Sequence, residues 1–378
     1  MDTLINPNVL ELTPYRAGRP AEEIQRLYHI EKIIKLASNE NLFPAPPDVT
    51  AAITREIANI HVYPFSDSYY LRKRIAQYNN VKPENIIVGS GSVEIIRMIV
   101  KTFLNPAKEE KILTSDKTFV MYKIAAVEEG GNHAIVEVPL GNDYRYDLNK
   151  MAQAVCKQTK IIFIANPNNP TGTVLSKKDL LNFIDKIPEN IIITFDNAYQ
   201  EYVTGVDDNE VADYFDGIQV AIHRKNIIVL RTFSKIYALA GLRVGYAIAD
   251  EEVISYLGRV MAPFNVTRLG QVAALASLNH DEFKNKSAQV NAMNRERLFK
   301  QLTDLGLKVV PSKANFLQFF PGTDTNDLNE GLLKEGVIIR PLHDFGFPDA
   351  MRVTIGTEEE NDFFIEKLKK VLKVLKEI

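Results

Sequence analysis

Cysteine is almost absent from this sequence. Cys156 is the single cysteine among 378 residues. One thiol can neither close an internal disulfide nor supply a thiol cluster for a metal ion, so we predict no disulfide framework and no metal site. Free cysteine usually packs as a small apolar residue, and we expect Cys156 to lie in the core rather than to act as a catalytic thiol.

Strong net charge and long apolar runs are absent as well. The chain has 45 basic and 48 acidic residues, for a net charge of −3. This balance gives no electrostatic reason to expect nucleic acid or a membrane surface as a partner. No apolar run approaches the roughly 18 residues of a membrane-spanning helix, and the N-terminal stretch MDTLINPNVLELTPY lacks the features of a signal peptide. We therefore predict a cytoplasmic protein.

The sequence does contain a repeated alternation of short apolar runs with amphipathic segments. Runs rich in Ile and Val, each ending in polar or turn residues, occupy residues 85–91, 160–167, 190–196 and 226–232. Such runs are typical of strands that are buried on both faces of a mostly parallel sheet. Helical patterns, such as those at 93–104 and 177–187, lie between them. The fold class is therefore predicted to be α/β, with a helix-covered sheet.

The length and a change of pattern indicate more than one domain. A chain of 378 residues is long for a single core, and about two domains are expected. Beyond residue 268 come a long helical segment that stops at Gly306, two strand-like segments at 307–320 and 336–342, and an amphipathic helix at the C-terminus. We predict an N-terminal arm (1–36) that packs with the small domain or a neighbouring subunit, a large domain (37–268) and a small α+β domain (269–378).

The segment IITFDNAYQEYV places charge at the end of a core strand. Asp196 follows four residues that suit a buried strand, and Tyr199 comes three residues later. An isolated buried carboxylate is costly unless a cation meets it. In open α/β sheets, ligands bind beyond the carboxyl ends of the strands. We therefore expect a cation from a ligand at Asp196.

A glycine-rich loop at 89–94, GSGSVE, follows another strand and opens a helix. Backbone N–H groups at a helix N-terminus can bind an anion, and glycines let a phosphate approach closely. The loop is not a dinucleotide fingerprint, because Glu94 stands where the last glycine would be, and there is no Walker A lysine. Alone, this loop is as well explained as an ordinary strand-to-helix turn.

A third segment, TFSKIYALAGLRVG, holds several groups that seek anions: Thr232, Ser234, Lys235 and Arg243. Singly, such a lysine or arginine is most often a surface group. Together with the phosphate loop and Asp196, they match a phosphorylated cofactor that carries an aldehyde and a basic ring nitrogen, which is pyridoxal phosphate. The lysine would form the Schiff base, and Asp196 would pair with the protonated ring nitrogen.

Six segments, in this order, resemble the class I and II aminotransferases of fold type I, and within that family the histidinol-phosphate aminotransferases. The segments are YRAGRPAEEI (15–24), IKLASNENLF (34–43), YPFSDSYYLRKRIA (63–76), NPNNPTG (166–172), SKIYALAGLRVGY (234–246) and MRVTIGTEEEN (351–361). The resemblance covers nearly the whole chain. It implies a large, mostly parallel, cofactor-binding sheet domain, a smaller α+β domain, and pyridoxal 5′-phosphate as cofactor.

The resemblance also implies a role for each matching position. Lys235 would carry the cofactor, Asp196 would bind its ring nitrogen, and Tyr199 its phenolic oxygen, so these three would be the catalytic residues. The cofactor-binding residues would be Ser92, Val93, Phe119, Asn169, Asp196, Tyr199, Thr232, Ser234, Lys235, Arg243 and Tyr63. Tyr15, Arg340 and Arg352 would bind the substrate. Tyr63 would reach the cofactor phosphate of the neighbouring subunit, which implies an obligate homodimer.

Three positions depart from the family pattern. Asn197 stands where the family usually has glutamate. The stretch Leu42–Pro44 replaces the commoner Pro-x-Gly, which could alter the loop at the mouth of the site. Phe119 stands where tyrosine is frequent. A phenylalanine can still stack on a cofactor ring, but it cannot contribute a hydroxyl contact.

The predicted activity is amino transfer between L-histidinol phosphate and 2-oxoglutarate or glutamate, as in histidine biosynthesis. The alternatives are an aromatic or other amino-acid aminotransferase of the same family and a phosphothreonine-type decarboxylase, which would use the same lysine and aspartate. An NAD-dependent dehydrogenase would need the glycine triplet that this chain lacks. A binding module that has lost its chemistry would not require the intact set of Lys235, Asp196, Tyr199 and Arg243.

Overall fold

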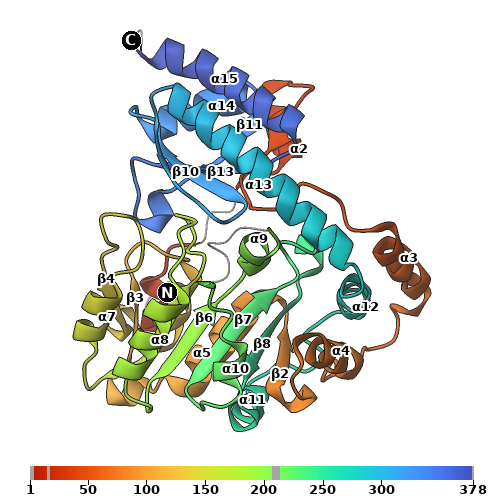
Figure 1. Ribbon diagram of the computed structural model, residues 1–378, viewed down its shortest axis with the longest axis vertical. Helices are drawn as coiled ribbons and strands as arrows, with labels where there is room; N and C mark the ends of the chain where they lie inside the picture. Colours follow the sequence, from red (N-terminus) through yellow and green to blue (C-terminus); the bar gives the residue numbers. More distant parts are fainter. Residues whose placement is uncertain (1–3, 15–17, 207–212, 377–378) are drawn as a thin grey trace.

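The computed structural model describes residues 4–14, 18–206 and 213–376 (Figure 1). Its largest element is a seven-stranded sheet with the order β2-β8-β7-β6-β5-β3-β4. Neighbouring strands from β4 to β7 run parallel, and β8 runs antiparallel to both β7 and β2. The strands are β2 (Ile86–Gly89), β3 (Lys111–Ser115), β4 (Ile135–Val138), β5 (Thr159–Ala165), β6 (Ile192–Asp196), β7 (Ile227–Thr232) and β8 (Gly245–Ala249). The predicted α/β class with a mostly parallel sheet is confirmed.

Helices bury both faces of this sheet. One face packs against α5 (Gly91–Phe103), α6 (Met121–Gly130) and α11 (Glu251–Gly258). The other packs against α7 (Leu148–Ala154), α8 (Lys177–Lys186) and α10 (Ile218–Ala221). Towards β2 and β8, that second face is covered by α3 (Pro47–Glu56), α4 (Tyr69–Asn79), α9 (Gln200–Thr204) and α12 (Arg268–Ser277). The Ile- and Val-rich strands lie inside these layers, as strands without polar alternation must.

A second, antiparallel sheet lies above the first in Figure 1 and has the order β12-β13-β10-β9. Its strands are β9 (Lys308–Val310), β10 (Phe316–Phe320), β12 (Arg340–Pro341) and β13 (Met351–Thr354). One face carries an apolar core with α13 (Asp281–Asp304), α14 (Thr325–Lys334) and α15 (Glu358–Lys376). The opposite face looks towards the large sheet, so its side chains can reach the carboxyl ends of the large sheet's strands.

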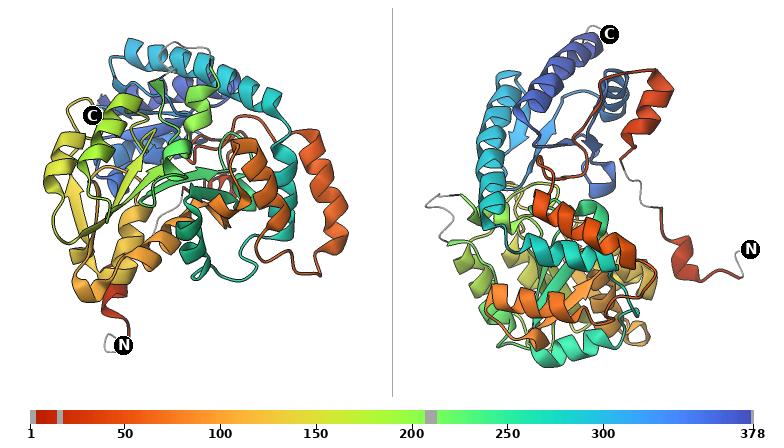
Figure 2. Two further views of the ribbon diagram at one scale, coloured as in Figure 1. Left: turned by 60° about the horizontal axis from the view of Figure 1, so that its bottom comes forward. Right: turned by 90° about the vertical axis from the view of Figure 1, so that its right-hand side faces the viewer.

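The N-terminal segment touches both parts of the molecule. The strand β1 (Ile34–Lys35) pairs in parallel with β11 (Val337–Ile338), and α2 (Ala21–Tyr28) lies near α14. Figure 2 shows α1 (Pro7–Leu10) below α2, projecting from one side of the molecule. There Glu11 accepts a hydrogen bond from the backbone of Asn132, beyond α6. The predicted domain limits stay a prediction.

Three local expectations need correction. Cys156 is exposed rather than in the core, because it lies in the turn between α7 and β5 and not in either element. The segment 336–342 forms two strands, β11 and β12, which belong to different sheets. The pattern RVGYAIA predicts a strand that begins at Arg243, but Arg243 has a positive φ of 54° and precedes β8, which starts at Gly245.

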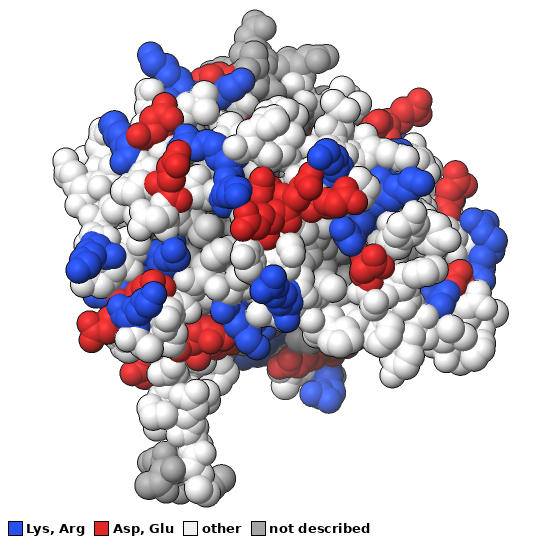
Figure 3. Space-filling model, turned by 90° about the horizontal axis from the view of Figure 1, so that it is seen from below, with Lys and Arg blue, Asp and Glu red and all other residues white. Residues whose placement is uncertain are grey.

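The face of the molecule that Figure 3 shows carries charges of both signs. Figure 3 shows Lys and Arg side chains interspersed with Asp and Glu over the underside of the molecule. Among the helices of the described residues, none combines the length and the apolar character needed to cross a bilayer.

Candidate active site

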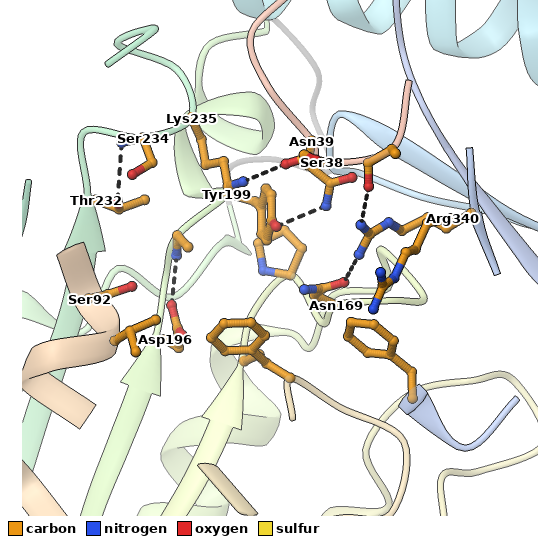
Figure 4. Close-up of a pocket in the computed structure, with 18 of the residues that line it drawn as sticks. Ser38, Asn39, Ser92, Asn169, Asp196, Tyr199, Thr232, Ser234, Lys235 and Arg340 are labelled. Carbon is orange, nitrogen blue, oxygen red and sulfur yellow. Dashed lines mark hydrogen bonds between the residues drawn. The ribbon is translucent and has the colours of Figure 1, made fainter. Parts of the chain in front are cut away.

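A cavity of about 270 Å³ opens at the carboxyl ends of β5, β6 and β7, beneath the small sheet (Figure 4). It is lined by twelve of the fourteen residues that the sequence analysis singled out, and these belong to both sheets or to the segments next to them. They are Ser92, Val93, Phe119, Asn169, Asp196, Tyr199, Thr232, Ser234, Lys235, Arg243, Arg340 and Arg352. Tyr63 does not line the cavity, and Tyr15 lies outside the described residues.

Asp196 is the last residue of β6, and only 5% of it is exposed. Its Oδ2 accepts a hydrogen bond from the Tyr122 hydroxyl at 2.8 Å, and its Oδ1 accepts one from the backbone N–H of Ala198 at 3.1 Å. Burial raises the pKa of Asp196, and the Tyr122 hydrogen bond opposes that rise. The two donors hold the carboxylate in place without supplying a positive charge, so a cationic ligand group would stabilise its ionised form.

Tyr122 is itself fixed by aromatic packing. Its ring stacks on Phe163 at 4.7 Å with an interplanar angle of 2°, and Phe119 meets it edge-on at 5.7 Å. Burial, followed by the charge of Asp196, raises the pKa of Tyr122 well above its usual value. Tyr122 therefore stays a neutral donor at any physiological pH.

Lys235 lies in the turn after β7, and its Nζ donates to the backbone oxygen of Ser38 at 3.0 Å. Burial lowers the pKa of Lys235 to about 7, helped by the positive charges of Arg352 and Arg243. A large fraction of this amine is therefore neutral near pH 7. Only the neutral form can attack an aldehyde or accept a proton.

Tyr199 follows β6 and points into the same cavity (Figure 4). Its hydroxyl accepts a hydrogen bond from Asn39 Nδ2 at 2.9 Å. Asn39 is in turn bound to Thr354 of β13, whose hydroxyl accepts from the Asn39 backbone at 2.9 Å and donates to its side chain at 3.2 Å. Asn39 thus ties the tyrosine of the large sheet to the small sheet.

The first turn of α5 meets Arg243 closely. Gly91 has a φ of +74°, and a Cβ there would lie 2.6 Å from Arg243 Nη2. Glycine is required because it alone tolerates both this backbone conformation and this approach. Arg243 Nη1 lies 3.4 Å from Ser234 Oγ. The free N–H groups of the helix start, two hydroxyl side chains and a guanidinium therefore converge on one point, which suits a phosphate.

Two buried arginines form the upper wall of the cavity. Arg340 and Arg352 are directly opposite each other in the antiparallel pair β12 and β13, and they are 6% and 5% exposed. Arg352 donates to Asn169 Oδ1 and, at 2.9 Å, to the backbone oxygen of Ala37. The Phe345 ring lies 5.9 Å from one guanidinium and 5.6 Å from the other.

The residues present fit pyridoxal phosphate. The buried Asp196 carboxylate matches a protonated ring nitrogen, the Lys235 amine matches an aldehyde, and the site at α5 and Arg243 matches a phosphate. Phe119 lines the cavity between these groups with an aromatic ring. The ring nitrogen, the aldehyde and the phosphate of the cofactor would each meet a group of matching charge or reactivity.

Sequence reasoning missed three residues that shape this site. Asn39 lies in the segment IKLASNENLF that was noted above, and Tyr122 lies three residues after Phe119, but neither was given a role. Phe345 lies in the mixed polar and apolar stretch PLHDFGFPDA (341–350), which carries no motif. A tyrosine three residues after a ring-stacking position was an available signal for Tyr122; nothing in the local sequence pointed to Phe345.

Comparison with known proteins agrees with the geometry. The sequence model of the family described as Aminotransferase class I and II matches residues 31–368. A protein of Anaeromyxobacter sp. (strain Fw109-5) named histidinol-phosphate aminotransferase is 42% identical over 370 residues, covering 98% of this chain and 99% of the relative. One of the same name from Moorella thermoacetica is 42% identical over 366 residues, covering 96% of this chain and 92% of the relative.

A solved structure extends the likeness to three dimensions. The histidinol-phosphate aminotransferase of Sinorhizobium meliloti, in complex with pyridoxal-5′-phosphate, superposes with a TM-score of 0.86 at 25% identity and covers 98% of each chain. The fold is therefore that of the fold-type-I aminotransferases, and the family match spans most of the chain. With its cavity, its lysine and its strand-end aspartate in place, the chain belongs to the family of class I and II aminotransferases.

Proposed function

We propose that this chain moves the amino group of L-histidinol phosphate to 2-oxoglutarate, with pyridoxal 5′-phosphate as its cofactor. The observation that carries this proposal is the placement of Arg340 and Arg352 on one wall of the cavity that also holds Lys235 and Asp196. A pair of buried guanidiniums provides a strong site for the phosphate or carboxylate of a substrate. Two relatives that are 42% identical over nearly the whole chain carry the matching name.

In this proposal, each side of the cavity holds one part of the cofactor. Lys235 binds its aldehyde covalently, Asp196 pairs with its ring nitrogen, and Phe119 packs on its ring. Tyr199 and Asn169 bind the phenolic oxygen. The phosphate is held by the amides of Ser92 and Val93, by Thr232 and Ser234, and by Arg243. When bound, pyridoxal phosphate supplies an electron sink for the bond that breaks at the substrate carbon.

Proton movement is the task of Lys235. A general base works best with a pKa near the operating pH, and the pKa of about 7 for Lys235 meets this requirement. The lowered pKa results mainly from burial, and the nearby Arg352 and Arg243 add to it. Once the substrate amine takes the place of Lys235 on the cofactor carbon, the freed Lys235 amine would be able to take a proton from one carbon and return it to another without leaving the cavity.

The substrate pocket must accept two kinds of anion. Histidinol phosphate has a phosphate and no carboxylate, whereas glutamate has two carboxylates. The planar fork of Arg352 pairs with either group, since both present two oxygens at similar spacing. Arg340 lies beside it, and we propose that Tyr15 adds a further donor.

Replacing Arg352 by lysine is expected to lower kcat/KM for both half-reactions roughly ten- to a hundredfold, the cost of one charge-assisted hydrogen bond of about 1.5–3 kcal/mol. The variant should keep its cofactor and its visible colour, because Arg352 does not contact the phosphate site. The measurement is the rate at which each substrate changes the visible band of the bound cofactor. Unchanged rates with both substrates would rule out the dual-anion pocket.

A screen of amines separates the proposed activity from its alternatives. The loaded protein is mixed with L-histidinol phosphate, aromatic amino acids, glutamate or phosphothreonine, and the visible band is followed. A fast change with histidinol phosphate supports the proposal. A much faster change with aromatic amino acids would indicate an aromatic amino-acid aminotransferase of the same family. Release of carbon dioxide from phosphothreonine would indicate the decarboxylase.

We further propose that the chain acts as a homodimer, in the cytoplasm. Tyr63 is 75% exposed and stacks on Phe264 at 4.5 Å. It belongs to a group of exposed apolar side chains close in sequence or contact, namely Ile57, Ile60, Val62, Tyr63, Phe65, Tyr69, Tyr70 and Phe264. An exposed apolar group of this kind is typical of an interaction site. From it, Tyr63 could reach the cofactor phosphate of a second subunit.

Sedimentation should therefore show a dimer in the active protein, and Tyr63→Phe should lower cofactor affinity without dissociating the subunits. The reason is that the hydroxyl would bind phosphate, while the ring would remain packed on Phe264. A matched control is Tyr256→Phe, another exposed tyrosine, which should change neither property. A fully active monomer would refute the shared site.

A further inference from the structure

The two arginines of the substrate pocket carry an electrostatic cost. Arg340 and Arg352 are directly opposite in the register of β12 and β13, and both are buried. Like charges at opposite positions of an antiparallel pair repel each other, and burial strengthens that repulsion because the surroundings screen it poorly. The pocket therefore needs negative charge, from the protein or from a ligand.

Asp344 supplies part of this charge. It follows Arg340 by four residues, and its Oδ2 lies 3.1 Å from Arg340 Nη2. Asp344 does not line the active-site cavity. It lies instead, with the other side of Arg340, on an adjoining cavity of about 540 Å³. Asp344 thus contacts the Arg340 guanidinium from the side of the adjoining cavity. A substrate anion would approach the same guanidinium from the side of the active-site cavity.

We propose that Asp344 is a specificity-determining residue that acts through Arg340: it weakens the binding of anions at the arginine pair, and it weakens a dianion more than a monoanion. This inference rests on the proposed function, since it takes the arginine pair as the substrate's anion site. Asp344 has no contact with substrate in this arrangement. Its effect is to neutralise a share of the charge that Arg340 would otherwise offer.

The difference between anions follows from their charges. A phosphate monoester carries about −1.5 to −2 at pH 7, whereas a carboxylate carries −1. The free energy of repulsion from Asp344 scales with the charge of the ligand. Asp344 therefore shifts the logarithm of the dissociation constant about twice as far for the phosphate as for the carboxylate. Asp344 therefore brings the affinities for the two substrate anions closer together, which helps a pocket that must release one before it binds the other.

The expected size of the effect is limited by solvent. The Asp344 side chain is 46% exposed, against 7% for Arg340. Partly exposed charge pairs are screened and contribute modestly. We expect removal of the Asp344 charge to tighten a monoanion roughly threefold and a dianion roughly tenfold, both estimates following from such modest pair energies. Added salt should reduce both changes.

The test uses two small anions of the same shape. Methyl phosphate is close to a dianion at pH 8, and methyl sulfate is a monoanion. Their dissociation constants are measured by calorimetry with the cofactor-loaded protein, so that the cofactor already fills its own phosphate site. Asp344→Asn should tighten methyl phosphate roughly tenfold and methyl sulfate roughly threefold. Asp344→Glu, which keeps the charge, should bind both ligands nearly as the wild type does.

A matched control is Asp349→Asn, which removes an exposed carboxylate five positions along the chain. It should change neither constant, because no ion pair of Asp349 is found within the described residues. Thermal unfolding gives a second measurement. Without added anion, Asp344→Asn should unfold at a lower temperature than the wild type, since the arginines lose a counter-charge, and methyl phosphate should raise its Tm more than it raises that of the wild type.

Two results would overturn the inference. If Asp344→Asn tightens neither anion, or tightens both by the same factor, Asp344 does not act through charge. A separate variant, Arg340→Gln, tests the pocket itself. If Arg340→Gln leaves methyl phosphate binding unchanged, the proposed anion site is wrong; if it weakens binding while Asp344→Asn has no effect, only the role of Asp344 fails.

Discussion

Replacing Lys235 by alanine is expected to lower kcat by at least about 10²–10⁴-fold, the usual contribution of a positioned general base. The loss should exceed this range, because the same amine would also bind the cofactor. The variant should still fold, since the Lys235 side chain makes one hydrogen bond within the described residues, to the Ser38 backbone. It should still bind pyridoxal phosphate, since the phosphate site at α5 and Arg243 does not involve the lysine.

Covalent labelling locates the reactive amine independently of turnover. Borohydride reduction of the loaded wild type should fix the cofactor on Lys235, as read by peptide mass mapping. The Lys235→Ala protein should yield no such label. A matched control is Lys225→Ala, which removes an exposed lysine paired with Glu252 on the surface; it should keep both label and activity. A label on any other lysine would refute the assignment of the site.

The pKa of Lys235 predicts a pH dependence in the cofactor-free protein. Its value of about 7 means that the amine is mostly charged below this pH and mostly neutral above it. The rate of reaction with an amine-selective reagent should therefore rise as the pH passes about 7. An ordinary surface lysine would show the same rise near its reference pKa of about 10.4. A midpoint for Lys235 near that higher value would contradict the burial effect.

Much of the site could be predicted because parallel strands end at one edge of a sheet. Asp196 and Thr232 are the last residues of the neighbouring strands β6 and β7, so two patterns that are distant in sequence had to meet in space. The phosphate loop after β2 joins them because β2 pairs with β8 and β8 pairs with β7. The assignment of these apolar runs to buried parallel strands therefore indicates the edge of the sheet at which ligand groups gather.

The parts that could not be predicted depend on distant contacts. Tyr122 meets Asp196 across 74 residues, and in its own helix pattern it looks like an ordinary core residue. Asn39 reaches Tyr199 across 160 residues. The split of residues 336–342 depends on partners as well: Val337 and Ile338 pair with β1, while Arg340 and Pro341 pair with β13. No local pattern of apolar residues identifies such partners.

The second large effect is expected at Asp196. Replacing it by asparagine should leave the fold intact, because the amide oxygen can still accept the hydrogen bond from the Ala198 backbone, while the Tyr122 hydroxyl can accept one from the amide N–H instead of donating. It should nevertheless lower kcat roughly a hundredfold or more: removing one partner of a buried ion pair costs about 3–5 kcal/mol, and each 1.36 kcal/mol is about tenfold in rate. Near-normal turnover would refute the role of Asp196 at the ring nitrogen.

Tyr122→Phe is the matched control for that variant. It removes a hydroxyl that donates to Asp196 at 2.8 Å but keeps the carboxylate charge and the ring packing. The expected loss is smaller, about tenfold, since one hydrogen bond to a charged group is worth roughly 1.5–3 kcal/mol and solvent or the ring nitrogen can replace part of it. An effect equal to that of Asp196→Asn would mean that orientation, and not charge, is what the site requires.

Stability measurements should separate the two states of the protein. Without cofactor, burial raises the pKa of Asp196 above its ordinary 3.8. The folded chain then binds more protons than the unfolded chain between these two pKa values, so the free energy of unfolding falls as pH rises through that window.

At neutral pH, Asp196→Asn removes the buried charge and should raise the Tm of the cofactor-free protein. In the loaded protein the same variant removes the partner of the protonated ring nitrogen, and it should lower both cofactor affinity and the Tm gained on loading. Asp196→Asn should thus change the Tm in opposite directions in the cofactor-free and the loaded protein, and this is expected only if the cation that meets Asp196 belongs to the cofactor. A Tm change of the same sign in both forms would contradict that pairing.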